Sequence, residues 1–319
     1  MTTLLVCSGG GHLKQLWTLW PRFGIAEDPL WVTFDTGLSR SLLADQDVVF
    51  SMYTPPRDLL GGLKVARLAD QIMRDRRIDR VISTGASLAV SFMAPARARG
   101  ITCHYIESAA RAAGPSLSGR LVSRIPGVNL YSQYPSWAGG RWHHAGAIYD
   151  GYRQGPPVTG APDKPRRVVV TLGTTESYGF RRAVEALIVA LPGDAEVLWQ
   201  TGATDVSGLS IDARETVPSA ELAQAVADAD LVVAHSGTGS AITAMDAGRC
   251  AVLLPRLQKY GEHIDDHQLQ IAGELDRRSL AIRCLVDDLA PDVFVRAMSR
   301  SVEIVPDPPP FVLLRDGAR

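Results

Sequence analysis

The amino-acid sequence predicts an α/β protein with two Rossmann-like domains that face each other across a cleft. Short apolar runs typical of buried parallel strands alternate with helical patterns along the 319 residues. Several of these strands end in a glycine turn that leads into a helix, as in Rossmann-like folds. A segment rich in glycine and proline, residues 151–165, divides the chain into halves of ordinary domain size. We therefore expect domains at residues 1–150 and 166–319, joined by this linker.

The first half begins with a strand and a glycine-rich turn. Thr3–Cys7 is an apolar run, and the turn Ser8–His12 contains three consecutive glycines, which let a backbone approach a ligand closely. Apolar residues then recur at helical spacing as far as Pro21. The spacing differs from the GxGxxG pattern of dinucleotide-binding proteins, so an NAD site is a poor fit. Further strands are expected at Leu30–Phe34, Asp47–Tyr53, Arg80–Ser83, Ile101–Ile106 and Asn129–Ser132, with a helix at Leu59–Arg76.

The second half repeats this arrangement. A strand at Arg167–Leu172 leads into the turn Gly173–Glu176. Another strand, Leu231–Ala234, leads into the small-residue turn His235–Ser240 and a helix at Ala241–Ala247. Such a junction presents backbone N–H groups and the positive end of a helix dipole, which favour a bound phosphate. Also expected are strands at Glu196–Gln200 and Ala251–Leu254, and helices at Phe180–Leu191, Ala220–Ala227 (capped by Ser219) and Val286–Val302.

Composition and charge limit the possible functions. The chain is 46% hydrophobic and 21% charged, as in ordinary globular proteins, and no apolar run reaches the ~20 residues of a membrane span. Its four cysteines lack metal-ligand spacing, so we expect reduced core thiols in a cytoplasmic protein. Residues 1–150 hold 16 basic and 11 acidic residues, a balance of +5, and residues 151–319 hold 17 and 23, a balance of −6. The first half is therefore expected to face an anionic partner, although so small a difference also arises by chance.

Several motifs resemble those of family 28 glycosyltransferases, which have the GT-B fold. SGGGH, ISTGASLAVSFMAPA and YIESAARAAGPSLSGRL resemble the acceptor-side subunit of the N-acetylglucosaminyltransferase that builds dolichol-linked glycan precursors. VVVTLGTTE, VVAHSGTGSAITAMDAG and DDHQ resemble its partner subunit, and LPRLQKYGEHIDDHQLQIA is similar to two-subunit bacterial exopolysaccharide glycosyltransferases. The chain thus resembles a fusion of two such subunits, except in the linker and after about residue 285.

The resemblance implies an inverting, metal-independent transfer of a sugar from a UDP-sugar to a polyprenyl-diphosphate-linked saccharide in polysaccharide biosynthesis. It implies no cofactor, no metal and no nucleic acid partner. The second half is expected to bind the donor and the first half the acceptor. A peripheral position on the inner face of the cell membrane is also expected, with the basic residues Arg111, Arg120 and Arg124 near the apolar residues Leu117, Leu121 and Val122.

The donor site is expected at the glycine turns of the second half and in the polar segment after Pro255. Family members usually place an acidic residue seven positions after the serine of the Ser-Gly pair, where it binds the ribose. This chain has Thr243 there, with Asp246 three residues later. The candidate donor-binding residues are Gly173, Thr174, Thr175, His235, Ser236, Gly237, Thr238, Gly239, Ser240, Arg256, His263, Asp266, His267 and Gln268.

The catalytic base has two candidates, His12 and Glu107. Inverting transfer needs a base to take the proton of the acceptor hydroxyl. His12 follows the first glycine turn, and Glu107 ends a predicted strand at the edge where parallel sheets bind ligands. The resemblance also places Glu107 near the acceptor. The candidate acceptor-binding residues are Gly9, Gly10, Gly11, Thr84, Gly85, Ala86, Ser108 and Arg111.

The similarity to exopolysaccharide enzymes, if it extends to chemistry, implies glucuronic acid as the donor sugar. A uronate carboxylate needs a cationic partner, and the planar guanidinium of Arg256 matches it best, ahead of Lys259 and His263. Alternatively, Arg256 pairs with Asp265 or Asp266, and the donor is a neutral hexose.

Two other functions fit the same fold. UDP-N-acetylglucosamine 2-epimerases also have two Rossmann domains, and a free sugar product without any lipid acceptor would favour that activity. A non-catalytic protein that binds nucleotide sugars would bind without turnover.

Overall fold

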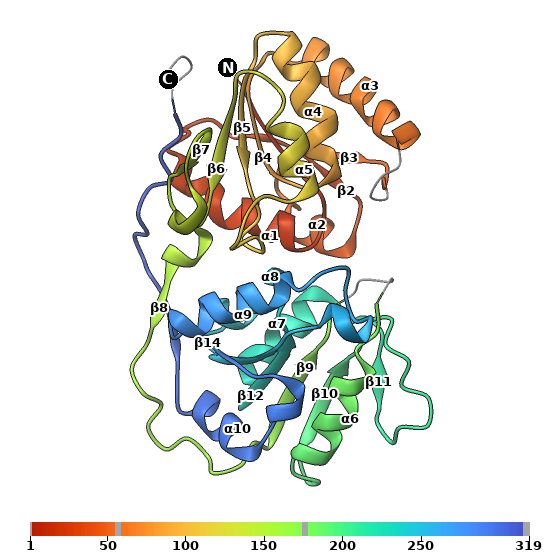
Figure 1. Ribbon diagram of the computed structural model, residues 1–319, viewed down its shortest axis with the longest axis vertical. Coiled ribbons are helices and arrows are strands. Elements are labelled where there is room, and N and C mark those ends of the chain that lie inside the picture. Colours follow the sequence, from red (N-terminus) through yellow and green to blue (C-terminus); the bar gives the residue numbers. More distant parts are fainter. Residues whose placement is uncertain (1, 55–58, 174–177, 315–319) are drawn as a thin grey trace. The chain divides into compact units, whose positions relative to one another are not determined.

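The chain folds into two compact units in the computed structural model, which describes residues 2–54, 59–173 and 178–314. Unit 1 holds the residues up to Asp150 together with the tail from Pro308, and unit 2 holds Gly151–Asp307. Each unit contains a parallel β-sheet flanked by helices (Figure 1). The predicted α/β fold with two Rossmann-like domains is therefore confirmed.

Unit 1 is built on a parallel sheet. Its strands are β1 (Thr2–Cys7), β2 (Leu30–Phe34), β3 (Val48–Ser51), β4 (Ile78–Gly85), β5 (Thr102–Ile106), β6 (Val128–Ser132) and β7 (Trp142–His144). Its α-helices are α1 (Gly11–Leu19), α2 (Gly37–Leu42), α3 (Leu59–Asp75), α4 (Ser87–Ala98) and α5 (Leu117–Val122). The strand order is β3-β2-β1-β4-β5-β6-β7, so the direction of winding changes between β1 and β4. Open parallel sheets bind ligands at such a switch point.

Unit 2 repeats this plan. Its main strands are β9 (Arg167–Thr171), β10 (Glu196–Gln200), β11 (Ala213–Arg214), β12 (Leu231–His235), β13 (Ala251–Leu254) and β14 (Ala281–Arg283). Its α-helices are α6 (Arg181–Ala190), α7 (Ser219–Asp228), α8 (Thr238–Asp246), α9 (His267–Arg277) and α10 (Pro291–Met298). The order β11-β10-β9-β12-β13-β14 places the switch point between β9 and β12.

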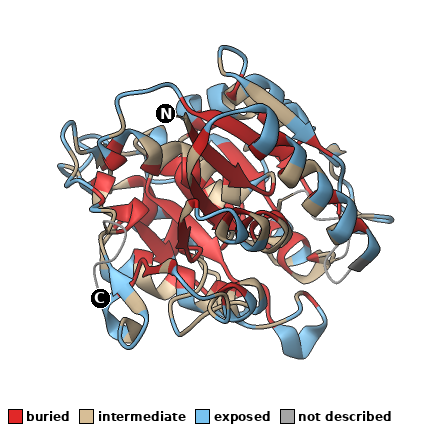
Figure 2. Ribbon diagram, turned by 90° about the horizontal axis from the view of Figure 1, so that it is seen from above, coloured by how far each residue is buried: buried red, intermediate tan, exposed pale blue. Residues whose placement is uncertain are grey.

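The apolar runs form the cores of both units. The central strands are buried beneath helices, which explains why their sequences are continuously apolar rather than alternating (Figure 2). All four cysteines are buried free thiols, as predicted. In the described part of the chain, no helix combines the length and apolarity that a bilayer span requires.

Two helix predictions need correction. The expected helix Val286–Val302 is shorter: α10 starts at Pro291, because proline lacks an N–H and fits the first helical position, and Val302 already belongs to the strand β15 (Val302–Ile304). Ser219 does not cap α7 but is its first residue, and Pro218 occupies the cap position.

The predicted domain limits also differ from the two units. β8 (Tyr152–Gln154), inside the expected linker, pairs with β15 in an antiparallel ribbon within unit 2. The sequence predicts that the tail belongs to the second domain, but the tail packs on unit 1. Phe311 is buried, its ring lies 5.6 Å from Phe23 and 5.5 Å from Tyr131 between centroids, and its N–H donates to the Arg22 carbonyl. Burial of this aromatic ring accounts for the return of the chain.

Candidate functional site

The two glycine turns of unit 1 interlock at its switch point. The N–H of Ser8 donates to the Gly85 carbonyl at 2.9 Å, and the N–H of Ala86 donates to Ser8 Oγ at 3.2 Å. The hydroxyl of Thr84 donates to the His12 carbonyl at 2.9 Å. The structure thus brings together the turn that contains Gly9, Gly10 and Gly11, where α1 begins, and the turn Thr84-Gly85-Ala86.

His12 lies half-buried between these turns. Its Nδ1 is 2.7 Å from the Thr84 carbonyl oxygen, and a carbonyl can only accept, so Nδ1 carries the hydrogen. A neutral ring then has its lone pair on Nε2, the form that a general base requires. Gly85 lies against the ring at φ +100°, and a Cβ there would come within 3.1 Å of it. The backbone of Gly85 therefore fixes the position of the imidazole.

Glu107 is enclosed rather than presented at a surface, with 1% of it exposed. Its carboxylate accepts from the N–H groups of Ser108 and Ser116 at 3.0 and 2.9 Å and from the Ser116 hydroxyl at 3.1 Å. Burial raises the pKa of Glu107, against the lowering effect of these hydrogen bonds. A Cβ on Gly119 would overlap its Oε2, so only glycine fits there. Glu107 supports the loop from Ser108 to α5, and its role as a base stays a prediction beside that of His12.

Two buried glutamines, which sequence reasoning missed, hold the same loop. Gln15 Oε1 accepts from the N–H of Ala109 at 2.8 Å, and Gln15 Nε2 donates to Ser108 Oγ at 3.0 Å. Gln133 Nε2 donates to the Glu107 carbonyl at 3.0 Å. Ser108 is therefore buried in this network, whereas Arg111 is half-buried and its carbonyl accepts from Trp137. A glutamine on the apolar face of α1 is the one sequence signal for this support.

His235 ends β12 at the switch point of unit 2. Its Nδ1 is 3.4 Å from the Thr171 carbonyl oxygen. A Cβ on Gly173 would lie 2.8 Å from its ring, and a Cβ on Gly237 would overlap the ring. Burial, and to a lesser extent the positive charge of Arg256, lowers the pKa of His235 to about 3. The ring is therefore neutral at physiological pH.

The turn after His235 leaves hydrogen-bonding capacity unused. Ser236 is fully buried, and its Oγ has no hydrogen-bond partner among the described residues. Gly237 occupies the N-cap position of α8, and no side chain caps the helix. Thr238, Gly239 and Ser240 form its first turn. A buried hydroxyl beside an uncapped helix N-terminus is suited to a phosphate, because both supply donors and the dipole favours negative charge.

Arg256 points inward, which corrects its predicted role. It is 2% exposed, and its guanidinium donates to the carbonyls of Leu172 and Tyr178 at 2.7 and 2.8 Å. Burial lowers the pKa of Arg256 to about 10, and Glu262 partly offsets this. Arg256 therefore links Leu172 to Tyr178 and does not present its charge to a ligand carboxylate. The alternative pairing with Asp265 or Asp266 is also not formed, since both carboxylates have other partners.

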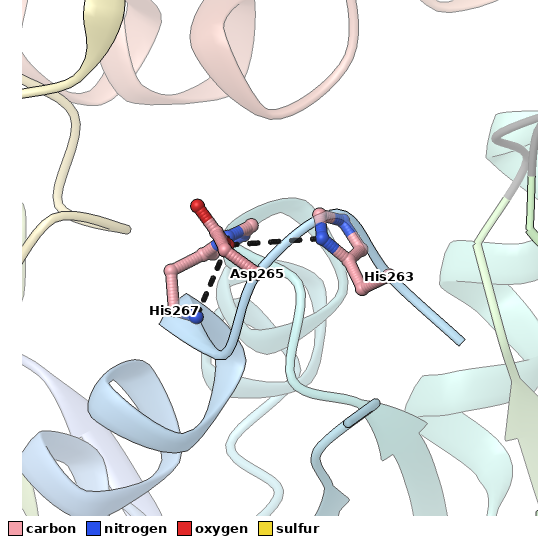
Figure 3. A group of neighbouring side chains, drawn as sticks. All are labelled: His263, Asp265 and His267. Atoms are coloured by element: carbon pink, nitrogen blue, oxygen red, sulfur yellow. Dashed lines mark hydrogen bonds and ion pairs between the residues drawn. The ribbon is translucent and has the colours of Figure 1, made fainter. Parts of the chain in front are cut away.

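The remaining donor-site candidates lie in the segment after β13 and in the first turn of α9. Gln268 is buried, and its Oε1 accepts from the N–H of Arg256 at 3.0 Å. Asp266 Oδ1 accepts from the N–H of Gln258 at 2.8 Å, while His263 and His267 both face Asp265 (Figure 3). Thr174 and Thr175 lie outside the described residues.

Thr243 and Asp246, the two candidates for the usual acidic ribose contact, both form hydrogen bonds within the protein. Thr243 Oγ1 donates to the Gly239 carbonyl at 3.0 Å. Asp246 Oδ1 accepts from the hydroxyl of Tyr152 at 2.6 Å, at the far end of α8 from the glycine turn. Asp246 therefore anchors β8 and does not replace the missing carboxylate.

Comparison with known proteins shows what the second half of the chain is similar to. Residues 167–294 match the glycosyltransferase family 28 C-terminal domain. Over 248 residues the chain is 29% identical to the UDP-N-acetylglucosamine--N-acetylmuramyl-(pentapeptide) pyrophosphoryl-undecaprenol N-acetylglucosamine transferase of Halorhodospira halophila. The matched region covers 71% of this chain but only 64% of that relative, so the chain spans less than two thirds of its length.

Solved structures share the fold at low sequence identity. MurG of Acinetobacter baumannii has a TM-score of 0.56 at 20% identity, covering 93% of this chain and 89% of its own. A UDP-GlcNAc 2-epimerase of Methanocaldococcus jannaschii has a TM-score of 0.58 at 11% identity, covering 93% and 91%. These likenesses concern the fold alone. Residues 167–294 therefore match the C-terminal domain of glycosyltransferase family 28, and the chain has the two Rossmann-like domains of the GT-B fold.

Proposed function

We propose that the protein transfers a sugar from a UDP-sugar to a polyprenyl-diphosphate-linked saccharide with inversion. The observation that carries this proposal is the unsatisfied junction at β12 and α8. Ser236 Oγ and the uncapped helix N-terminus would donate to the diphosphate and stabilise the charge that develops on the leaving UDP.

The acceptor would lie at the interlocked turns of unit 1, with His12 as general base. Nε2 of the neutral imidazole takes the proton of the acceptor hydroxyl while its oxygen bonds to the sugar carbon and UDP departs. The hydrogen bond from Nδ1 to the Thr84 carbonyl supports this role, because it fixes the tautomer.

The donor sugar is proposed to be neutral, with N-acetylglucosamine the first choice. The relative from H. halophila carries that sugar in its name. Glucuronic acid, in contrast, needs a cationic side chain, and the bonds of Arg256 to two backbone carbonyls commit it to the protein. Activity with UDP-glucuronate and none with UDP-N-acetylglucosamine would overturn this choice.

We also propose peripheral attachment of unit 1 to a cytoplasmic membrane surface, in polysaccharide biosynthesis. Leu117 and Leu121 on α5 are 55% and 42% exposed, and Leu60 and Leu63 on α3 are 74% and 62% exposed. Both helices contact α4. Exposed basic residues on or beside these two helices include Lys64, Arg67, Arg74, Arg120 and Arg124. Val122, predicted to be exposed with them, is instead buried in the core.

The function is tested by supplying a panel of UDP-sugars with a synthetic polyprenyl-diphosphate-glucose and measuring UDP release and lipid-linked product. We expect product only when donor and acceptor are both present. Ser236→Ala should weaken UDP binding by about 10-fold or more, since a hydrogen bond to a charged group contributes ~1.5–3 kcal/mol. Ser210→Ala, at an exposed serine of the same unit, is the matched control.

Other outcomes would point to other functions. Conversion of the UDP-sugar without any acceptor would indicate an epimerase. Tight UDP-sugar binding with no turnover on any lipid-linked acceptor would indicate a binding protein.

A further inference from the structure

Three side chains converge just before and at the start of α9. His263, Asp265 and His267 occupy alternate positions of the chain, and His267 is the first residue of the helix. Figure 3 shows the Asp265 carboxylate beside both histidines, with dashed lines to each of them. The sequence analysis places this segment at the donor sugar and expects no metal. The mutual approach of the three side chains is visible only in the structure.

The distances suit ligands of one ion. One atom from each of the three residues lies within 4.8 Å of the others. His263 Nδ1 is 3.9 Å from Asp265 Oδ1, and His267 Nδ1 contacts the same oxygen. Two ligand atoms of a tetrahedral Zn²⁺ site with bonds of ~2.0–2.2 Å lie ~3.3–3.6 Å apart, so small rotations of these side chains would bring the three atoms to ligand positions. The two rings lie 4.5 Å apart and are inclined at 84°, so both can direct a nitrogen to one point beside the carboxylate.

The three side chains are held in place but remain accessible. His263 stacks on Tyr178 with ring centroids 5.3 Å apart and an angle of 21°. Asp265 Oδ1 also accepts from the N–H of His267 at 3.2 Å, which fixes the carboxylate. The side chains of His263 and His267 are 17% and 15% exposed, and that of Asp265 is 38% exposed. An ion can therefore enter from solvent without a rearrangement of the core.

We propose that His263, Asp265 and His267 bind a divalent transition-metal ion, for which Zn²⁺ is the best match. Two imidazole nitrogens and one carboxylate oxygen suit zinc and its neighbours, whereas Mg²⁺ and Ca²⁺ prefer sites built from oxygen. Three protein ligands leave a coordination position open to water or a ligand. The competing explanation is a hydrogen-bonded aspartate and histidine pair that binds no ion.

A functional consequence follows, and it rests on the proposed function. His267 lies in the segment proposed to hold the donor sugar, so an ion bound there would withdraw its imidazole from the sugar. Zn²⁺ is therefore expected to weaken UDP-sugar binding to the wild type and to have no such effect on Asp265→Asn. The ion is then a regulator, and the transfer chemistry does not depend on it.

The binding test uses the full-length, metal-free protein without nucleotide. Calorimetric titration with Zn²⁺ should show saturable binding, and titration with Co²⁺ should produce visible absorption bands of a nitrogen- and oxygen-ligated ion. His263→Ala and Asp265→Asn should each lower the affinity by at least about 10- to 100-fold, the loss that removal of an outer partner of a ligand already causes. The side-chain amide in Asp265→Asn retains an oxygen that can accept from the His267 N–H, so this variant should keep its fold. His143→Ala, at an exposed histidine of unit 1, is the control.

Two results would overturn the inference. Absence of saturable Zn²⁺ and Co²⁺ binding by the wild type would leave only the hydrogen-bonded pair. Equal affinity in the wild type, His263→Ala and Asp265→Asn would place the ion elsewhere. An unchanged UDP-sugar affinity with Zn²⁺ bound would refute the competition alone. Failure of glycosyl transfer would affect none of the nucleotide-free measurements.

Discussion

Each of the two sheets places a histidine beside its switch point, and the two surroundings correspond. His12 Nδ1 is 2.7 Å from the carbonyl oxygen of Thr84 in β4, and His235 Nδ1 is 3.4 Å from that of Thr171 in β9. In each case a glycine with positive φ follows on the neighbouring strand and lies against the ring, Gly85 at φ +100° and Gly173 at φ +81°. Both imidazoles therefore face the end of the adjacent central strand, although His12 belongs to α1 and His235 to β12.

The two sites differ in whether the polar side chains near the histidine already have hydrogen-bond partners. Ser8 Oγ accepts from a backbone N–H, and the Glu107 carboxylate accepts several hydrogen bonds. Ser236 Oγ, in contrast, has no hydrogen-bond partner among the described residues. An unpaired buried hydroxyl destabilises a fold, so it is expected where a ligand completes the bonding. The comparison indicates a preassembled support in unit 1 and a site completed by its ligand in unit 2.

The largest expected effect is a loss of activity when His12, the proposed base, is replaced. His12→Ala should lower kcat by about 10²- to 10⁴-fold, because it removes the base, while UDP affinity stays within about twofold of the wild type. Steady-state kinetics with the lipid-linked acceptor and calorimetric titration with UDP measure these quantities. His143→Ala should leave both unchanged. A kcat close to that of the wild type in His12→Ala would exclude the imidazole from proton transfer.

The support in unit 1 is tested through stability. Gly119→Ala places a methyl group against the fixed Glu107 carboxylate and should lower the free energy of unfolding by about 2–3 kcal/mol. Gly62→Ala, near the start of α3 where the nearest atom is 3.8 Å away, should instead raise it by about 0.5–1 kcal/mol. Urea denaturation of both variants provides the comparison. Equal effects would mean that the Glu107 carboxylate is not held rigidly.

The neutral His235 ring predicts that the free energy of unfolding falls by about 2 kcal/mol in mildly acidic solution. The pKa of His235 is about 3 in the folded protein, against an ordinary value of 6.5, so below pH 6.5 the unfolded chain binds the additional proton. Stability from this group is therefore complete above pH 6.5 and is lost as the pH falls. Between pH 6.5 and 5 the loss should be ~2 kcal/mol, at 1.36 kcal/mol per pH unit. His235→Asn should show a correspondingly flatter dependence in urea denaturation, whereas parallel curves would refute a neutral, buried ring.

The smallest expected effect concerns the charge difference between the halves. Arg120→Ala and Arg124→Ala should each weaken binding to anionic vesicles by about 1 kcal/mol, roughly fivefold, and added salt should reduce the difference. Arg166→Ala, at an exposed arginine of unit 2, should have no effect. Vesicle co-sedimentation measures this. If the wild type does not sediment with anionic lipid at low salt, the proposed attachment is wrong.

Much of the fold could be predicted because it depends on local patterns. The strands that flank the switch points are apolar runs followed by glycine turns, and both signals lie within a few neighbouring residues. β14 and β7 have only three residues each, too few for a pattern, and the tail packs on Phe23, which is remote in sequence.

The candidate site was predictable in its location but not in the directions of its side chains. Arg256 follows a strand like a typical ligand contact, yet the carbonyls that hold it belong to Leu172 and Tyr178, about 80 positions earlier. The burial of Glu107 depends similarly on a glycine at position 119 that leaves room for its carboxylate. Contacts between distant parts of the chain decided both cases, and a single sequence does not contain them.

Because the tail packs on Phe23 and Tyr131, unit 1 is built from two separate stretches of the chain. Unit 2 is, in chain order, an insertion within unit 1, because residues on both sides of it complete the first core. A fragment that ends at Asp150 would lack Phe311 and the hydrogen bonds that Arg22 exchanges with Pro309 and Phe311. Separate expression of the halves would therefore leave unit 1 with uncovered aromatic rings, unless a peptide containing residues 308–314 were supplied in trans.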